Sequence, residues 1–206
     1  MQYFITGASG FIGKRLVRKL LDRDATNVIY FLIREVERES LPALYEFWGC
    51  DASRAIPVVG DLTQPLLGVA AVDVKKLGKK TTHFFHLAAI YDLAAPAEEQ
   101  QAANVDGTRN AVRFAEAVNA GCFQHVSSIA AAGLYDGVFR EDMFEEAEEL
   151  DHPYFRTKHD SEGIVRRECS IPWRIYRPAL VVGDSRTGEM DKIDGPYYFF
   201  KLIQKL

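Results

Sequence analysis

The sequence has little cysteine, no long apolar run and no excess of positive charge, and each shortage narrows what the protein can be. Its three cysteines, Cys50, Cys122 and Cys169, lie far apart and form no CxxC pair, which argues against a disulfide framework or a zinc site. No uncharged apolar stretch approaches the roughly 20 residues of a membrane-spanning helix. The net charge of −4 argues against a general nucleic-acid-binding surface. We therefore expect a cytoplasmic protein with no integral membrane segment, no metal and no nucleic-acid partner.

The chain does contain enough apolar sequence for one buried core, since 48% of its 206 residues are hydrophobic. Short apolar runs alternate along it with segments of helical periodicity. The runs are Gln2 to Thr6, Val28 to Ile33, Ile56 to Asp61, His83 to Ala88, Phe123 to Ser128, WRIYRP and LVVG; the main helical segments are Gly10 to Arg23, ESLPALYEFW, Asn104 to Val118 and Tyr154 to Arg167. Continuously apolar runs suit strands that helices cover on both faces. The pattern predicts an α/β fold with a doubly wound parallel sheet, in which ligands bind beyond the carboxyl ends of the strands.

Three glycines, Gly7, Gly10 and Gly13, lie in TGASGFIG at the first junction between strand and helix. Glycine permits a tight turn there and lets a pyrophosphate approach the main chain, while the helix N-terminus offers unpaired N–H groups and the positive end of its dipole. The spacing is GxxGxxG rather than the common GxGxxG, and glycines alone often mark only a turn. Their place after the first strand and before an amphipathic helix favours dinucleotide binding.

The residues after the second and third expected strands bear on the choice of dinucleotide. Arg34 follows the second strand directly and Arg38 lies four residues later; guanidinium groups suit the 2′-phosphate of NADP. Glu35 keeps NAD open as an alternative, and both arginines could be ordinary surface charge. Asp61 ends the third strand, where it would either reach the adenine amino group or cap a turn. We predict NADPH as the cofactor, with NAD less favoured.

Side chains suited to carbonyl reduction lie in the second half of the chain. Tyr154 and Lys158 are four residues apart in YFRTK, so on a helix they share one face. A nearby ammonium favours the phenolate form of a tyrosine, which suits it to general acid catalysis at neutral pH. Ser127 and Ser128 end the run FQHVSS, where a hydroxyl could bond the oxygen that becomes negative as hydride arrives. Each feature alone has an ordinary structural explanation, but the glycine turn, serines and YxxxK in this order predict a reductase site.

These motifs resemble the extended branch of the short-chain dehydrogenase/reductase superfamily. The resemblance rests on TGASGFIG, GDL, HLAA, NVDGT, VSS, YFRTK and YRPALVVG, which together span nearly the whole chain. Within that branch, HLAAIYDLAA, HVSSIAAAGLYDGVFREDMF and GEMDKIDGPYYFFKLIQK are similar to the amino-terminal reductase domain of bacterial fatty acyl-CoA reductases, which make fatty alcohols for wax esters. The resemblance implies a Rossmann-type fold and an NADP-dependent oxidoreductase of lipid metabolism.

The resemblance also implies a role for individual residues. Tyr154 would be the catalytic acid, and Lys158 would favour its phenolate and hold the nicotinamide ribose. Ser128 matches the superfamily serine better than Ser127, and Asn104 would hold a proton-relay water near the lysine unless it only caps a helix. The segment 178–181 would cover the nicotinamide. The expected cofactor-binding residues are Gly7, Ser9, Gly10, Phe11, Ile12, Gly13, Arg34, Arg38, Asp61, Leu62, Ala88, Ala89, Lys158, Pro178 and Val181.

The implied reaction is hydride transfer from NADPH to a fatty acyl-CoA, a fatty aldehyde, or both. A thioester would give a thiohemiacetal that expels coenzyme A and leaves an aldehyde, and a second hydride would give the alcohol. Two alternatives stay open, because one fold serves many substrates. One is an extended reductase or epimerase acting on a sugar nucleotide or sterol, and the other is a dinucleotide-sensing module without catalysis.

Extended members of the superfamily continue into a carboxyl-terminal region that builds the substrate pocket, whereas this sequence stops at Leu206. We expect residues 1–206 to form a single NAD(P)-binding Rossmann domain in which 184–206 begin an incomplete substrate-binding region, the remainder of the same protein being missing. An unfinished substrate side would expose apolar residues and favour self-association into a homo-oligomer. The residues concerned are Tyr197, Tyr198, Phe199 and Phe200.

Overall fold

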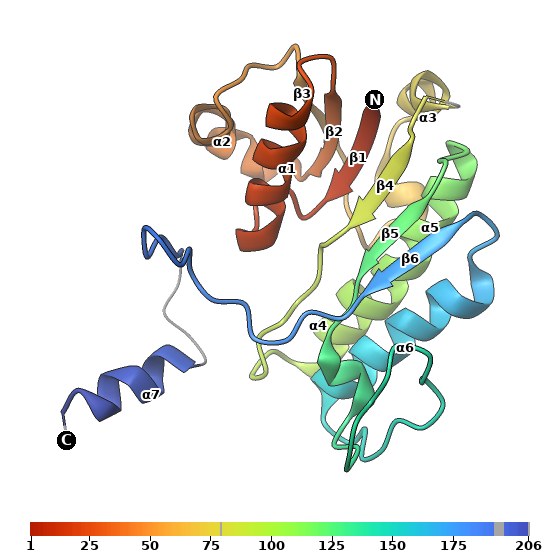
Figure 1. Ribbon diagram of the computed structural model, residues 1–206. Coiled ribbons are helices and arrows are strands. Elements are labelled where there is room, and N and C mark those ends of the chain that lie inside the picture. Colours follow the sequence, from red (N-terminus) through yellow and green to blue (C-terminus); the bar gives the residue numbers. More distant parts are fainter. Residues whose placement is uncertain (79, 192–195, 206) are drawn as a thin grey trace.

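The computed structural model describes residues 1–78, 80–191 and 196–205, which build one parallel sheet with helices on both faces (Figure 1). The sheet has six strands in the order β3-β2-β1-β4-β5-β6. They are β1 (Gln2–Thr6), β2 (Val28–Ile33), β3 (Ala55–Val59), β4 (His83–His86), β5 (Phe123–Val126) and β6 (Trp173–Tyr176). The chain winds outward from β1 in one direction and then from β4 in the other, so ligands are expected beyond the carboxyl ends of β1 and β4. The predicted doubly wound α/β fold is confirmed.

Each face of the sheet has its own hydrophobic core. On one face lie α1 (Phe11–Arg23) and α2 (Leu41–Trp48), which bury Val17 and Trp48 against β1 and β2. On the other lie α3 (Ala71–Leu77), α5 (Gly107–Ala117) and α6 (Pro153–Glu168), which bury Phe114 and Ile164. Shorter elements connect them: η1 (Glu35–Ser40), η2 (Pro65–Gly68), α4 (Ala97–Gln100), the π-helical turn η3 (Gln101–Asp106) and η4 (Ile129–Ala132). Burial on both faces explains why the strands read as continuous apolar runs.

The strands are in register through a row of stacked aromatic rings on the α5 and α6 face. Phe4, Phe84 and Phe123 are paired across β1, β4 and β5, with ring centroids 5.0 Å and 5.3 Å apart. All three are fully buried. Their contacts fix how the carboxyl ends of the three strands align.

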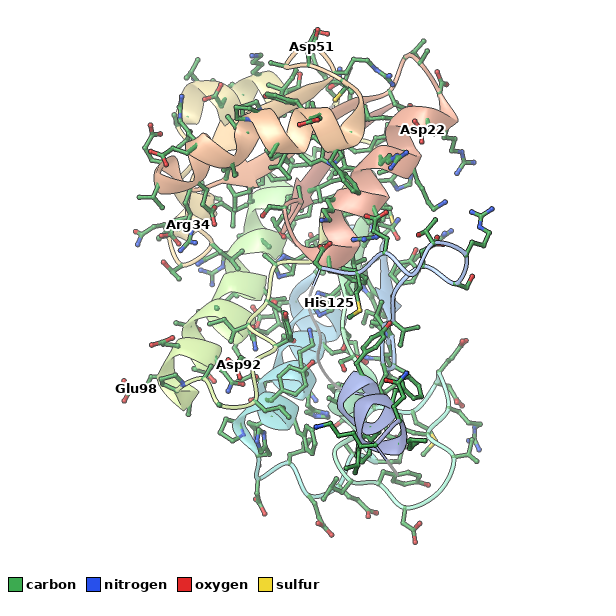
Figure 2. All side chains as sticks on the ribbon, turned by 90° about the vertical axis from the view of Figure 1, so that its left-hand side faces the viewer. Asp22, Arg34, Asp51, Asp92, Glu98 and His125 are labelled. Carbon is green, nitrogen blue, oxygen red and sulfur yellow. The ribbon has the colours of Figure 1, made fainter. Side chains whose placement is uncertain are left out.

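Two residues further along, the same face carries a second row that is polar. Thr6 of β1 is paired with His86 of β4, which is paired with His125 of β5, and the two imidazoles stack 5.5 Å apart. Thr6 Oγ1 lies 2.7 Å from His86 Nδ1. Neither ring nitrogen of His125, which lies in the middle of the molecule (Figure 2), has a hydrogen-bond partner among the described residues. Burial lowers the pKa of His86 to about 3 and that of His125 well below its usual value, so both rings are neutral.

The segment after β6 departs from expectation. LVVG (180–183) was expected to form a strand, but it has no strand structure, and Leu180, Val181 and Val182 are exposed. The prediction is wrong because an apolar run becomes a strand only beside a pairing partner, and in the described chain β6 is the last strand of the sheet. The main-chain N–H of Gly183 donates instead to the Tyr197 hydroxyl at 2.7 Å.

The chain closes with α7 (Pro196–Ile203), which stands apart from the sheet (Figure 1). Phe199 and Phe200 are 69% and 56% exposed. Tyr197 is half-buried, and the side chain of Tyr198 lies outside the described residues. Self-association through these rings stays a prediction, as does the assignment of 184–206 to a substrate-binding region.

The neutral histidine pair predicts acid sensitivity. In the unfolded chain both imidazoles take up protons below about pH 6.5, whereas in the folded chain they stay neutral, so stability is full above pH 6.5 and is lost as the pH falls below it. Each should cost about 1.4 kcal/mol of unfolding free energy per pH unit between pH 6.5 and 5. Urea unfolding across this range should show that loss, and His125→Phe should halve its slope. An unchanged slope in the variant would contradict the assignment.

Candidate active site

The glycine turn between β1 and α1 lets three parts of the backbone approach more closely than side chains would permit. Gly7 has a φ of +72°, and a Cβ there would lie 2.7 Å from the main-chain nitrogen of Ala88. A Cβ at Gly13 would overlap the carbonyl oxygen of Gly7. Gly10 is the N-cap of α1 and has no side chain to bond the N–H groups of the first turn. The close approach of β1, β4 and α1 and the uncapped helix end therefore fit the pyrophosphate of a dinucleotide.

The adenosine end of such a ligand would meet Arg34 and Asp61, which line one pocket together with Gly60 and Gln64. Arg34, at the exposed margin of the molecule in Figure 2, donates to Glu37 Oε1 at 2.7 Å. Asp61 Oδ1 accepts from the main chain and hydroxyl of Thr63, both at 2.8 Å, and these bonds hold the pKa of the Asp61 carboxyl below its usual value. Asp61 thus caps a turn and also lines the pocket.

Arg38 lies elsewhere. Its Nε donates to Glu35 Oε2 at 3.0 Å, and the side chain lines a different groove, beside Tyr30 and Asp73. Arg34 directly precedes the turn η1 and Arg38 lies within it, so the two arginines line different pockets, and Arg34 is the one beside Asp61.

The two serines after β5 do different things. Ser127 is buried, and its hydroxyl donates to Glu162 Oε2 at 2.8 Å. Ser128 is half-buried, and its Oγ accepts from the main-chain N–H of Ala130 at 3.1 Å, which starts η4. Because Ser127 is committed to the interior, the geometry favours Ser128 as the serine that can donate to a substrate oxygen.

Helix α6 places Tyr154 and Lys158 on one face, one turn apart. Pro153 is its first residue, and the His152 side chain accepts from the Tyr154 N–H, so the helix starts just before the tyrosine. Lys158 is 3% exposed and its Nζ donates to the carbonyl oxygen of Val126 at 3.1 Å, at the end of β5. Burial lowers the pKa of Lys158 to about 8, while the carboxylate of Glu162 acts in the opposite direction. Lys158 thus reaches the end of β5, two residues before Ser128, and Tyr154 lies one turn before Lys158 on α6.

Asn104 lies in the π-helical turn η3 and is 1% exposed. Its Oδ1 accepts from the N–H of Ile90 at 2.7 Å, and its Nδ2 donates to the Ile90 carbonyl at 2.9 Å and to Thr157 Oγ1 at 3.2 Å. The side chain therefore holds the loop after β4 against α6. The relay water expected at Asn104 stays a prediction.

The remaining expected cofactor residues surround the same edge of the sheet. The main-chain N–H of Ala88 donates to Thr6 Oγ1 at 3.3 Å, and the Pro178 carbonyl accepts from Ile129 beside Ser128 at 3.2 Å. Leu62 packs against the larger core, while Val181 is 45% exposed. Of the others, Ser9 is exposed, Ile12 is 38% exposed and Ala89 is half-buried. The ring centroid of Phe11 lies 4.1 Å from the central carbon of the Arg15 guanidinium.

Sequence reasoning missed a buried chain of hydrogen bonds that joins these parts. Thr108 Oγ1 donates to the Asn104 carbonyl at 2.6 Å and lies 3.0 Å from His86 Nε2. Because the Thr108 hydrogen is used there, His86 Nε2–H donates to Thr108, and Thr6 donates to His86 Nδ1. The Thr157 hydroxyl donates to the Tyr154 carbonyl at 3.2 Å. The chain runs in order through Ala88, Thr6, His86, Thr108, Asn104, Thr157 and Tyr154.

A signal for this chain was available. Thr6, His86, Thr108 and Thr157 are the buried polar residues of TGASGFIG, HLAA, NVDGT and YFRTK to which the motif analysis gave no role. The structure shows that they hold the motifs in register with one another. Their placement links the glycine turn to the tyrosine helix through groups with no direct access to solvent.

No cluster of three or more metal-ligating side chains occurs within the described ranges. Over the same residues, no helix is long and apolar enough to cross a membrane. The doubly wound sheet with its glycine turn is that of a nicotinamide-dinucleotide-dependent oxidoreductase domain.

Comparisons with known proteins agree with this class. The family model described as "Male sterility protein" matches residues 5–206, and the chain belongs to that family of NAD-binding domains within the extended short-chain dehydrogenase/reductase superfamily. The chain is 36% identical over 205 residues to a linear gramicidin synthase from Brevibacillus parabrevis, covering 92% of this chain and 4% of that protein. It is 27% identical over 210 residues to the aldehyde reductase lnaA of Aspergillus flavus, covering 93% of this chain and 20% of that one.

Solved structures show the same fold. The terminal R domain from the myxalamid PKS-NRPS pathway superposes with a TM-score of 0.78 at 30% identity, over 90% of this chain and 50% of that one. A thiolation-reductase di-domain from an archaeal non-ribosomal peptide synthetase gives 0.80 at 21% identity, over 99% and 58%. The chain therefore spans about half the length of these solved chains and a much smaller part of the curated relatives.

The geometry of the glycine turn predicts that a substitution to alanine is costly at Gly13 and mild at Gly10. Gly13→Ala should destabilise the chain by about 3 kcal/mol, because its Cβ would overlap the Gly7 carbonyl, and should weaken dinucleotide binding at least tenfold. In Gly10→Ala the nearest atom would be the Gly7 oxygen at 3.4 Å, an ordinary contact, so the cost should stay within about 1 kcal/mol. Thermal unfolding and fluorescence titration with NADPH would measure both. Equal losses in the two variants would count against the close approach at Gly13.

Proposed function

We propose that this chain is the cofactor-binding and catalytic part of an NADPH-dependent reductase that acts on an acyl thioester, on the matching aldehyde, or on both. The observation that carries the proposal is the burial of Lys158 at the end of β5, on the helix face that also carries Tyr154 and at the strand end that leads into Ser128. A buried ammonium one helical turn from a phenol, at the edge of the sheet that holds the glycine turn, suits the protonation of a carbonyl oxygen during hydride transfer.

The proposed roles follow from the geometry. The hydroxyl of Ser128 donates to the substrate carbonyl oxygen, and Tyr154 delivers the proton to it as negative charge develops. The Lys158 ammonium supports the phenolate that Tyr154 leaves behind and bonds the nicotinamide ribose. When bound, NADPH supplies the hydride. The glycine turn and the N-terminus of α1 hold the pyrophosphate, and Arg34 meets the 2′-phosphate.

With a thioester, one hydride and one proton would give a thiohemiacetal, whose carbon–sulfur bond then breaks to release the thiol and an aldehyde. A second hydride and proton would convert the aldehyde to an alcohol. Resemblance to fatty acyl-CoA reductases supports an acyl-CoA substrate. Similarity to proteins named peptide synthetases, and to a thiolation-reductase di-domain, supports a thioester carried on a thiolation domain. The chemistry at the carbonyl is the same for both sources.

The experiment is NADPH oxidation by the full-length protein that contains this chain, comparing wild type with Tyr154→Phe. We expect oxidation with a long-chain acyl-CoA, a thioester on a carrier domain, or an aldehyde, and the substrate that supports it identifies the source. Tyr154→Phe should reduce kcat at least a hundredfold, because it removes only the acidic hydroxyl, and should leave the Kd for NADPH within about twofold. Turnover that survives in this variant would refute the proposed acid.

A separate prediction concerns the choice of cofactor. Arg34 lies beside Asp61 in the expected adenosine pocket, whereas Arg38 lines another groove. Arg34→Ala should weaken NADPH binding about tenfold and leave NADH binding nearly unchanged, because only NADPH has the 2′-phosphate. Arg38→Ala is the matched control, with an expected change below twofold. Equal losses for both nucleotides in Arg34→Ala would point to a general charge effect.

The alternatives predict other outcomes. A reductase or epimerase for a sugar nucleotide or sterol would bind a uridine nucleotide or sterol and fail to oxidise NADPH with any thioester. A sensing module would bind NADPH and show no turnover with any substrate. A cytoplasmic location and a homo-oligomeric state also stay proposals.

A further inference from the structure

Helix α6 contains a second buried charged residue that the proposed reaction does not use. Glu162 follows Lys158 by one turn and is fully buried. Its carboxylate accepts from Ser127 Oγ at 2.8 Å and from Arg166 Nε at 2.9 Å. It also accepts from Arg177, through Nη2 at 2.6 Å and Nε at 3.0 Å. Both oxygens of this carboxylate are thus fully engaged.

These bonds join segments that the proposed reaction needs to keep together. Ser127 precedes Ser128 at the end of β5, and Arg177 follows β6 directly. Arg177 also donates to the carbonyl oxygens of Met143 at 2.7 Å and Arg140 at 3.1 Å. Glu162 therefore ties α6, with Tyr154 and Lys158, to both neighbouring strand ends and to the loop before α6.

Glu162 places a negative charge among the cations of this region. Lys158, Arg166 and Arg177 are three cations, and the side chains of the two arginines are only 23% and 13% exposed. Like charges at short range in a poorly hydrated site oppose one another strongly. Without the carboxylate, the arginines would act on Lys158 with no counter-charge, and its ammonium form would become less favourable.

We propose that Glu162 is a positioning residue of the site, whose carboxylate keeps Lys158 in its charged form and holds α6 against the strand that ends in Ser127 and Ser128. The inference rests on the proposed function, since it gives Lys158 the task of binding the nicotinamide ribose as an ammonium. It assigns to Glu162 no contact with substrate or cofactor.

The directions of the pKa shifts agree with this geometry. Burial raises the pKa of Glu162, but hydrogen bonds from Arg177, Ser127 and Arg166 outweigh burial and lower it overall, so the group is ionised. Burial lowers the pKa of Lys158, and Glu162 is the charged group that raises it.

Other titratable groups around Lys158 do not replace Glu162. His86 on β4 and His125 on β5 are neutral, and Tyr154 lies on α6 itself. The turn η4 consists of Ile129 and alanines. The remaining elements packed against α6 are α4, η3 and α5. Four of their charged side chains are exposed to solvent: Glu98, Glu99, Asp106 and Arg113. The other two, Arg109 and Glu116, bond Glu168 and Ser170 at the far end of α6.

The test measures NADPH affinity against pH, from 7 to 9.5, in the full-length protein that contains this chain. Wild-type affinity should fall as the pH rises through about 8, the pKa of Lys158, because the ammonium loses its proton. Lys158→Met should remove this fall. In Glu162→Gln the fall should occur about one pH unit lower, and Glu162→Asp, which restores the charge, should move it back toward wild type. Glu145→Gln removes an exposed carboxylate bonded to Arg167 on the same helix and should change nothing.

Arg166→Gln removes a cation instead of the carboxylate. Glu162 keeps its bonds to Ser127 and Arg177 in this variant, so Arg166→Gln tests the inference even if Glu162→Gln does not fold. Removing this cation should move the fall to higher pH by about half a unit. Unchanged midpoints in Glu162→Gln and Arg166→Gln would overturn the inference, as would a pH dependence that persists in Lys158→Met. Because binding is measured without turnover, the inference can hold even if no thioester or aldehyde is reduced, and the proposed reaction can hold even if the midpoints do not move.

Discussion

The burial of the Lys158 ammonium against the end of β5 is the constraint on which the rest of the site depends. A charged group that is 3% exposed is unfavourable unless its surroundings compensate it, and here the compensation comes from the Val126 carbonyl and the nearby Glu162 carboxylate. Glu162 needs Arg166 and Arg177 in its turn. This buried ammonium lies one turn from a cluster of paired charges, and that cluster attaches α6 to two strand ends. The burial of Lys158 and the packing of α6 therefore depend on the same contacts.

A second set of polar groups connects the site to the cofactor turn. Thr6 and His86 are 80 residues apart in sequence and 2.7 Å apart in the fold, and the bonds continue through Thr108 and Asn104 to the tyrosine helix. Each link is short and buried, so a shift of one strand would leave buried polar groups without their hydrogen-bond partners. The aromatic row of Phe4, Phe84 and Phe123 lies directly beneath and fixes the same three strands. Apolar packing sets the register of the sheet, and the polar row transmits that register to the site.

The proposed site and the last part of the chain differ in burial. Lys158, which is proposed to bind the cofactor, is buried at the end of β5, whereas Leu180 to Val182 and most of the described side chains of α7 are exposed. The chain spans about half the length of the solved reductase chains to which it is similar.

The sequence by itself determined the order of strands and helices, the glycine turn and the spacing of Tyr154 and Lys158, because these depend on periodicity and on neighbours within one or two turns. Only the tertiary structure decided which serine is free, since Ser127 is distinguished from Ser128 by a carboxylate 35 residues later in the chain. It likewise placed Arg34 and Arg38 in different pockets, gave the first residues of the helix expected from Asn104 a π-helical turn, and left LVVG without a strand. Each of these outcomes depends on a partner, or on the lack of one, far away in sequence. Local patterns specify the elements, and the choice between chemically equivalent side chains is made by contacts that exist only once the sheet has formed.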